Sequence, residues 1–416
     1  MGDPEKLVPD PDLEQGPWRQ EHVWVSHYNF SPEVTEHRTA PPEIVIHDST
    51  LRDGEQAPGV SLDTDDKIRI ATMLDEVGVQ YIEAGFPPVS AQDRDSITAI
   101  CELGLKSQIT CLSRAMRKDI DMAAECGVWG VVLEVPVGYP RLMYQFEWPE
   151  QKVYDRVMDA VQYAKKEHGL GVILFMIDTA RARIEFLQRL VSDAADTGCL
   201  DRLAVVDTVG AIVPEAMAKL TRQIKIWVDV PLEVHCHNDL GLGVANTIAG
   251  LMNGAEIAST TVGGLGQRAG NAPTEDVIMA LKVAYGIPCN LDTHKLVELS
   301  KLVQDLTGYQ QPAYREVVGD NVFRWAAGIP VAALLKEPRT VEAFGPELLG
   351  RQHQIELGKK SGKANIIWKL DQMNLEPLPA DKVEKLLEGV KRHASETKRA
   401  LSEEEFLELY QNLNSI

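Results

Sequence analysis

The sequence lacks the features that place a chain in a membrane, outside the cell or on nucleic acid. No stretch approaches the roughly 20 consecutive apolar residues of a membrane-spanning helix. Residues 1–16 have neither the basic segment nor the apolar segment of a secretory signal. Basic residues are few, because 42 Lys and Arg stand against 62 Asp and Glu, and the net charge of −20 repels phosphate. We therefore expect a cytoplasmic protein without nucleic-acid or membrane partners.

Cysteine is also scarce and scattered. The six cysteines form no CxxC pair, in a chain of 416 residues that is too long to need disulfides for stability. We expect reduced, mostly buried thiols. With 44% apolar and 25% charged residues, the chain has enough material for a sizeable core. Its length suits two or three domains, or one large barrel with an appendage.

From residue 43 onward, short β-rich runs alternate with helix-length amphipathic segments. Eight such units in series predict a parallel sheet, and eight is the number that closes into a barrel. A doubly wound open sheet is the alternative, but no Gly-rich turn follows the first strand. We predict an α/β fold, a (β/α)8 TIM barrel. The expected strands are 43–48, 80–85, 107–112, 130–135, 171–177, 202–207, 231–237 and 256–263.

Segments of different character flank the predicted barrel. Residues 1–40 are rich in proline and acid, and we assign them to an N-terminal arm; residues 41–290 form the barrel. Residues 291–416 contain helical stretches broken by Gly and Pro, and we assign them to C-terminal helical subdomains. The first of these stretches, residues 293–306, has an apolar face that a monomeric barrel has no obvious place to bury.

Polar residues gather where the predicted strands end, which is where a TIM barrel has its active site. His235 and His237 lie two apart on the seventh strand, so both side chains can point the same way and form half of a metal site. An oxygen ligand could come from Asp48 or Asp53, and spacing does not choose between them. Cys236 points to the other side and is expected to fill the core.

Other strand ends carry further candidates. Arg52 cannot lose its proton at working pH, so it suits a carboxylate or a developing enolate oxygen. Glu83, Asp178 and Thr208 follow other strands. The glycines of residues 263–271 do not match a dinucleotide fingerprint and suit a mobile loop near an anion. GKKSGK at 358–363 falls short of a P-loop.

Several motifs in fixed order resemble one family. DSTLRDGEQ, IEAGFP, DTVG, HCHNDLGLGVAN and GLGQRAGN are similar to those of the 2-isopropylmalate and homocitrate synthases, whose relatives include citramalate synthases and 3-hydroxy-3-methylglutaryl-CoA lyase. The resemblance covers about residues 43–290 and extends more loosely through VGDNVF (318–323) and ELGKKSGKANI (356–366).

The resemblance implies one divalent metal ion, Zn²⁺, Mn²⁺ or Mg²⁺, and a set of residues around it. The implied ligands are Asp53, His235, His237 and Asn271, the implied catalytic residues are Arg52, Glu83 and Asp178, and the implied substrate-binding residues are Gln56, Thr208 and Arg181. It also implies acetyl-CoA or a close acyl-CoA and a 2-oxo acid as substrates. The implied assembly is a homodimer whose tail reaches the neighbouring site.

Three features depart from the family pattern. The tail motif HESGIH of the synthases is replaced by residues 324–330 (RWAAGIP), which contain no histidine. The usual glutamate after the fifth strand corresponds to Asp178. After the fourth strand the chain reads EVPVGYPRL (134–142), where oxo-acid synthases have a Ser/Thr-rich run. Proton transfer would then fall to Asp178, Glu83 or metal-bound water.

We therefore predict a metal-dependent acyltransferase that condenses acetyl-CoA with a 2-oxo acid to give a 2-hydroxy di- or tricarboxylic acid and CoA. A C–C lyase or aldolase using the reverse chemistry is the first alternative. The missing tail histidines favour it, but the cysteine that such lyases carry in the last glycine loop is absent from residues 263–271. A non-catalytic homologue is the second alternative.

Overall fold

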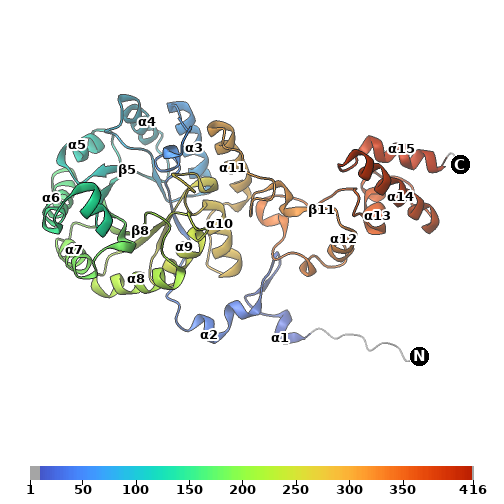
Figure 1. Cartoon of the computed structure of the whole chain (residues 1–416), viewed down its shortest axis with the longest axis horizontal. Helices are drawn as coiled ribbons and strands as arrows, with labels where there is room; N and C mark the ends of the chain where they lie inside the picture. The colour runs from blue at the N-terminus through green and yellow to red at the C-terminus, as the bar shows by residue number, and fades with distance from the viewer. Residues whose placement is uncertain (1–9, 415–416) are drawn as a thin grey trace. The chain divides into compact units, whose positions relative to one another are not determined.

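The computed structural model describes residues 10–414 and divides the chain into two compact units. One unit comprises residues 28–311, and the other combines the described part of 1–27 with residues 312–414 (Figure 1). Residues 1–9, the start of the segment that lacks a secretory signal, lie outside the described part. Within that part, no helix is both long and apolar enough to cross a membrane.

The larger unit is a closed barrel of eight parallel strands, which confirms the predicted TIM barrel. The strands follow one another around the barrel in sequence order, and the last pairs with the first. They are β3 (Val45–Asp48), β4 (Tyr81–Glu83), β5 (Gln108–Arg114), β6 (Gly130–Pro136), β7 (Gly171–Ile177), β8 (Arg202–Asp207), β9 (Leu232–Cys236) and β10 (Ile257–Thr260).

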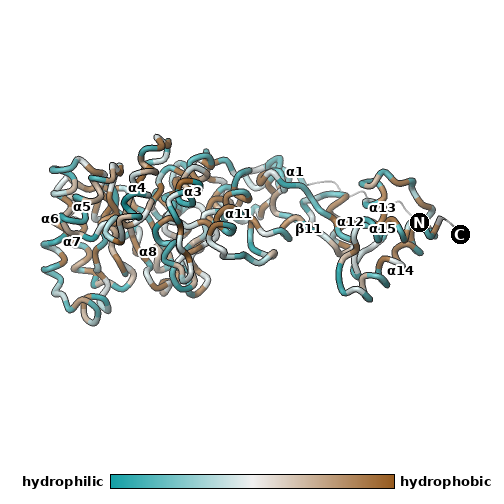
Figure 2. The backbone as a smooth tube through the Cα atoms, turned by 90° about the horizontal axis from the view of Figure 1, so that it is seen from above, coloured by the Kyte–Doolittle hydropathy of each residue, from teal (hydrophilic) through white to brown (hydrophobic). Residues whose placement is uncertain are grey.

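Helices surround this barrel, one after each strand (Figure 1). Apolar and polar segments alternate along them in Figure 2, as expected where one face of a helix packs on the strands. The first begins at a capping box formed by Asp63 and Asp66 and ends at Gly78, whose φ of 93° suits glycine. The helices are α3 (Thr64–Val77), α4 (Ala91–Glu102), α5 (Arg117–Glu125), α6 (Glu150–His168), α7 (Ile184–Asp196), α8 (Pro214–Trp227), α9 (Gly243–Leu251) and α10 (Thr274–Met279).

The barrel interior has an apolar layer and a charged layer. The apolar layer is a cluster of seven buried side chains: Leu112, Val132, Ile173, Phe175, Ile177, Ala204 and Val206. In the charged layer, the buried Glu233 carboxylate lies 3.0 Å from His47 Nδ1 and 2.7 Å from Arg202 Nη1. Burial opposes this charge, but His47 and Arg202 outweigh it and lower the pKa of Glu233 to about 2. A buried carboxylate is thus fully paired inside the barrel.

The helix expected to need a partner subunit is buried on the barrel itself. Helix α11 (Leu296–Thr307) contacts α3, and Leu296, Leu299 and Val303 are buried. The expectation that a lone barrel could not bury this face was therefore wrong, because a helix outside the eight repeats can still pack on their outer surface. The compact barrel unit accordingly extends to Gln311, beyond the boundary at 290 drawn from the sequence.

The second unit contains a small mixed part and a helical part. In the mixed part, β11 (Arg324–Trp325) pairs with β12 (Gln354–Ile355), and α12 (Gly328–Leu334) packs with them. In the helical part, α13 (Lys363–Gln372), α14 (Ala380–Thr397) and α15 (Glu403–Asn414) enclose a cluster around Phe406. The N-terminal arm is divided between the two units. This unit includes α1 (Pro11–Glu14), β1 (Arg19–Gln20) and β2 (Val23–Trp24), whereas the barrel unit includes α2 (Pro32–Thr35).

Candidate active site

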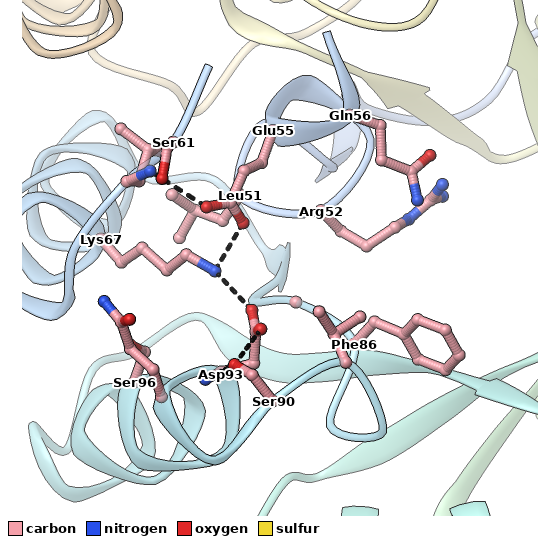
Figure 3. Close-up of a pocket in the computed structure, with 14 residues that line it drawn as sticks. Leu51, Arg52, Glu55, Gln56, Ser61, Lys67, Phe86, Ser90, Asp93 and Ser96 are labelled. Atoms are coloured by element: carbon pink, nitrogen blue, oxygen red, sulfur yellow. Dashed lines mark hydrogen bonds and ion pairs between the residues drawn. The ribbon is translucent and has the colours of Figure 1, made fainter. Parts of the chain in front are cut away.

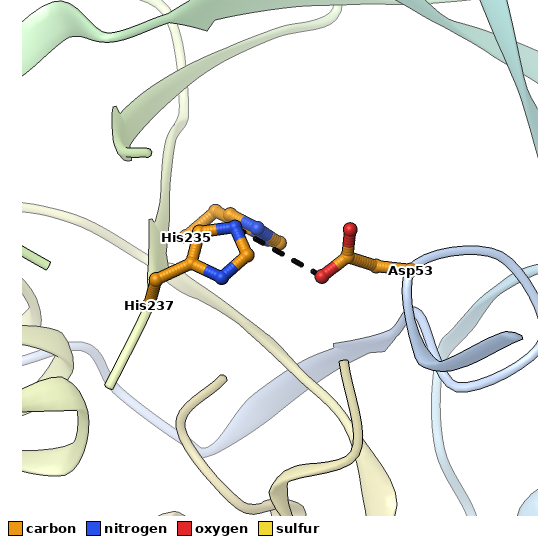
Figure 4. A group of neighbouring side chains, drawn as sticks. All are labelled: Asp53, His235 and His237. Carbon is orange, nitrogen blue, oxygen red and sulfur yellow. Dashed lines mark ion pairs between the residues drawn. The ribbon is translucent and has the colours of Figure 1, made fainter. Parts of the chain in front are cut away.

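Three buried side chains converge at the carboxyl ends of the barrel strands. Asp53 follows β3, while His235 and His237 stand on β9 and just beyond it. One ligand-type atom from each lies within 4.8 Å of the others (Figure 4). The exposed fraction of each residue is 5% or less. These three residues form a group that could hold a metal ion, as the spacing of the two histidines predicted.

The direction of its side chain shows which aspartate, Asp48 or Asp53, can serve as the oxygen ligand beside the two histidines. Asp48 follows His47 on β3, so its side chain points away from the barrel interior. Its oxygens accept hydrogen bonds from the Thr50 N–H at 2.9 Å and the Thr274 hydroxyl at 2.8 Å. Asp48 therefore holds local backbone in place, and Asp53 is the carboxylate that faces the histidines.

Hydrogen bonds orient both imidazoles for metal binding. His237 Nδ1 donates to the Gly270 carbonyl at 3.1 Å, which leaves Nε2 as the nitrogen with a lone pair. His235 Nδ1 lies 2.8 Å from Ser259 Oγ. Burial, supported by the neighbouring His237, lowers the pKa of His235 to about 3, and burial also lowers the pKa of His237. Both rings are therefore neutral at physiological pH, the form that binds metals.

Asn271 has an oxygen that suits a further ligand. Its Nδ2 donates to Asp53 Oδ2 at 2.5 Å, whereas its buried Oδ1 has no hydrogen-bond partner among the described residues. A buried unpartnered oxygen is costly unless something binds it. The donor set of two imidazoles, one carboxylate and one amide oxygen fits a divalent ion. The residues present therefore suit the metal that the sequence resemblance implies.

Arg52 is held beside this group by two carboxylates, and one of its nitrogens has no partner among the described residues. Its Nη1 donates to Asp53 Oδ1 at 2.9 Å, and its Nε lies 2.8 Å from Glu83 Oε2. Burial opposes the guanidinium charge, but Glu83 and Asp53 outweigh it and raise the pKa of Arg52. Its Nη2 is buried and has no hydrogen-bond partner in the described part of the chain. That group is a preorganised donor for an oxygen anion.

The other expected site residues fall into two groups. Asp178 is fully buried with φ 65°, and both of its oxygens accept from Arg181, Oδ1 from Nε and Oδ2 from Nη2, at 2.8 Å each. Thr208 Oγ1 accepts the Asp178 N–H at 2.7 Å, so these three residues form one cluster. Gln56 instead lies on the exposed side and accepts from Gln267 at 2.5 Å.

The glycine loop after β10 is tied down by a residue that the sequence analysis did not single out. Arg268 pairs with Asp239 through two hydrogen bonds of 2.8 and 3.0 Å, and it donates to the Thr208 carbonyl at 2.7 Å. Gly270 has φ 77°, and a Cβ there would collide with the Gly264 carbonyl oxygen. Arg268 therefore anchors the loop that carries Asn271 to the segments that follow β8 and β9.

A cavity of about 340 Å³ lies beside the Arg52 segment and contains a buried lysine. Lys67 of α3 lies 2.7 Å from Glu55 and 3.1 Å from Asp93, and only 2% of its side chain is exposed (Figure 3). Glu55 in turn accepts the Leu62 N–H at 3.0 Å. Lys67 therefore ties the segment that carries Arg52 and Asp53 to two helices.

Replacing Lys67 with methionine should destabilise the protein by about 3 kcal/mol, because two partly buried carboxylates lose their cation. Thermal unfolding measured by circular dichroism checks this. Lys165→Met is the matched control, since Lys165 and Asp201 are each 34% exposed and such a pair contributes less than about 1 kcal/mol. Equal losses in the two variants would contradict the assigned role of Lys67.

The replaced tail motif packs within its own unit. Trp325 contacts the cluster of Val331, Leu334 and Ile355, and its Nε1 donates to Glu342 at 3.0 Å. His353 Nε2 lies 2.9 Å from the same carboxylate. Trp325 is thus a hydrogen-bonded part of a small core in this unit.

Comparison with known proteins agrees with this geometry. The HMGL-like family model matches residues 43–303, and the homocitrate synthase post-HMGL domain-like model matches residues 317–398. A homocitrate synthase of Methanopyrus kandleri is 44% identical over 84% of this chain and 88% of that protein. An (R)-citramalate synthase and a 2-isopropylmalate synthase of Methanocaldococcus jannaschii are 42% and 39% identical over 83% and 88% of this chain, each match spanning 70% of the relative.

Solved structures show the same fold. The HMG-CoA lyase of Bacillus subtilis superposes with a TM-score of 0.59 at 21% identity, over 66% of this chain and 97% of the lyase. At this identity the likeness concerns the barrel only.

Proposed function

Because the chain belongs to the HMGL-like family and is an enzyme of the acyltransferase class, we propose that it condenses acetyl-CoA, or a close acyl-CoA, with a 2-oxo acid in a metal-dependent reaction. The products are CoA and a 2-hydroxy di- or tricarboxylic acid. The observation that carries this proposal is the convergence of Asp53, His235 and His237 beside the unpartnered Nη2 of Arg52.

We assign the metal to Asp53, His235, His237 and Asn271. A divalent ion held there supplies a Lewis acid that polarises the keto group of the oxo acid. Arg52 Nη2 donates to the oxygen on which negative charge develops when the acyl group becomes an enolate. Glu83 keeps the guanidinium in position through the 2.8 Å ion pair with Nε.

Residues on the neighbouring strand ends hold the oxo acid. We assign the Thr208 hydroxyl to its carboxylate, since Thr208 is fixed by the Asp178 N–H and faces inward from the end of β8. Arg181 neutralises Asp178, which keeps that carboxylate from repelling an anionic substrate. Gln56, on the exposed side, lies where the substrate enters. In this arrangement Asp178 has a positioning role rather than the proton-transfer role expected from the sequence.

A thiol assay tests the reaction. The metal-loaded protein is mixed with acetyl-CoA and a panel of pyruvate, 2-oxobutyrate, 2-oxoisovalerate and 2-oxoglutarate, and free CoA is measured. Release that depends on one oxo acid is the expected result. Product formed only from a hydroxy-acyl substrate would establish the lyase alternative instead. No turnover with either kind of substrate would refute the proposal.

We also propose that the chain forms a homodimer through its second unit. The family resemblance implies a dimer whose tail reaches the neighbouring site, and Ile329 on α12 (87% exposed) and Ile367 on α13 (59% exposed) are accessible to a partner. Light scattering should report a dimer. Ile329→Asp should raise the dimer dissociation constant by roughly 10-fold or more, about 1.4 kcal/mol. Ile226→Asp is the control, because Ile226 on the barrel helix α8 is 78% exposed. A monomer at all concentrations would contradict the proposal.

A further inference from the structure

The barrel carboxylates expected to transfer protons are already engaged. Both oxygens of Asp178 accept hydrogen bonds from Arg181. Glu83 Oε2 accepts from the Ser49 hydroxyl at 2.5 Å and pairs with Arg52 at 2.8 Å. Only Glu83 Oε1 has no hydrogen-bond partner among the described residues, and a proton there would weaken the ion pair with Arg52. The tail segment that replaces the family's histidine motif, residues 324–330, offers no imidazole either. Of the acceptors expected from the sequence, metal-bound water has no such competing contact, and the barrel interior offers one further carboxylate.

Glu134 points into the barrel at the level of Arg52. It stands on β6 two residues after Val132, which belongs to the interior cluster, so the two side chains share the inner face. Glu134 pairs in register with Phe175 on β7. The Phe175 ring centre lies 5.6 Å from the Arg52 guanidinium carbon and 5.2 Å from the His235 ring centre. The carboxylate thus shares one level of the interior with the candidate site.

The carboxylate of Glu134 has no partner in the structure. Among residues 10–414, which the structure describes, none forms a hydrogen bond or ion pair with it. Its side chain is partly buried, and an inward-facing side chain in a closed barrel reaches solvent only through the mouth. An unpaired carboxylate inside a barrel calls for a physical reason, because burying a charge without a partner is unfavourable.

The charges that face Glu134 come from four elements. The carboxylate interacts electrostatically with four charged side chains: Arg52 after β3, Glu83 on β4, Arg114 on β5 and Arg141 after β6. The three arginines already have partners: Arg52 pairs with Asp53 and Glu83, Arg114 binds Asp119 twice, and Arg141 donates to Gln145. Burial outweighs their attraction and raises the pKa of Glu134 above the usual range of a glutamate. Such a carboxylate accepts a proton more readily than one in water.

From this placement we propose that Glu134 is the catalytic base that removes a proton from the methyl group of the acyl-CoA. This inference rests on the proposed condensation. The methyl C–H bond breaks and an O–H bond forms on Glu134. The C–H electron pair becomes the C=C bond of the enolate, and the thioester carbonyl pair moves to its oxygen, where Arg52 Nη2 donates.

The remaining steps return Glu134 to its starting state. The enolate carbon forms a bond to the keto carbon of the oxo acid, and the keto π pair becomes an alkoxide. The proton held by Glu134 neutralises this alkoxide, which restores the carboxylate. Water then cleaves the thioester, giving a carboxylate, CoA and one proton. EVPVGYPRL (134–142), where the family has a Ser/Thr-rich run, thus begins with an acid–base group.

Glu134→Gln and Glu134→Asp test the proposal in the metal-loaded full chain. Glu134→Gln keeps the shape but cannot accept the proton, so kcat should fall roughly 10² to 10⁴-fold with little change in KM. Glu134→Asp should retain far more activity. In D₂O, mass spectrometry should show deuterium entering the acetyl-CoA methyl group with the wild type and not with Glu134→Gln. Glu125→Gln, an exposed position on α5, is the matched control and should behave as the wild type.

The pH profile adds a readout that a structural role would not change. The acid limb of kcat/KM should lie above the usual range of a glutamate in the wild type, and it should vanish from the residual activity of Glu134→Gln. The proposal would be overturned if Glu134→Gln exchanged methyl protons and turned over as fast as the wild type. It would also be overturned if the substitution changed only the preference among oxo acids. If the wild type condenses normally in those cases, the proposed function still holds. A wild type that neither exchanges methyl protons nor releases CoA refutes both.

Discussion

Replacing His235 and His237 together with alanine should abolish divalent metal binding and, with it, the condensation. The two rings present neutral Nε2 atoms to Asp53, and their Nδ1 atoms are held by Ser259 and Gly270. Loss of a single outer partner of a metal ligand costs roughly 10- to 100-fold in affinity, so losing two ligands should exceed that. Elemental analysis should find about one metal ion per wild-type chain and essentially none in the variant.

The control for this experiment removes two histidines elsewhere. His37 and His294 have side chains that are 84% and 64% exposed, and His37→Ala/His294→Ala should keep both metal and activity. Circular dichroism should show that the barrel of the metal-site variant still folds, because most of the core is independent of these rings. Full metal occupancy in the folded His235→Ala/His237→Ala protein would disprove the assigned site.

Arg52→Lys should lower kcat by roughly 10²-fold or more, as removal of one oxyanion donor does in other enzymes. The guanidinium contacts Glu83 through Nε and Asp53 through Nη1, and it directs Nη2 elsewhere. An ammonium group keeps the charge but not this planar arrangement of donors. Steady-state kinetics with acetyl-CoA and the accepted oxo acid measure the effect.

The matched control is Arg117→Lys, because Arg117 is 60% exposed and pairs with Asp159 at the surface. It should leave both kinetic constants unchanged. If Arg52→Lys raised KM without lowering kcat, Arg52 would only bind substrate, and its assignment to the transition state would be wrong.

The sequence by itself determined the barrel and the pair of histidines that we assign to the metal. Alternation of β-rich runs with amphipathic helices depends on local periodicity, so all eight strands appear close to the predicted ranges. The His235–His237 spacing is local as well, since residues two apart on a strand share a face. The family motifs then named Asp53 and Asn271 as further ligands, and the structure brings both of them to the two histidines.

Only the tertiary structure decided the features that depend on contacts between distant segments. Asp48 is satisfied by Thr50 and by Thr274, more than two hundred residues away, and Asp178 is occupied by Arg181. The apolar face of α11 is covered by α3, a helix at the other end of the barrel sequence. Glu134 appears in the sequence as an ordinary strand residue. Its significance follows from the lack of a partner at the level of Arg52, and whether a charge is paired is set by the packing of several strands, not by the spacing of residues along one of them.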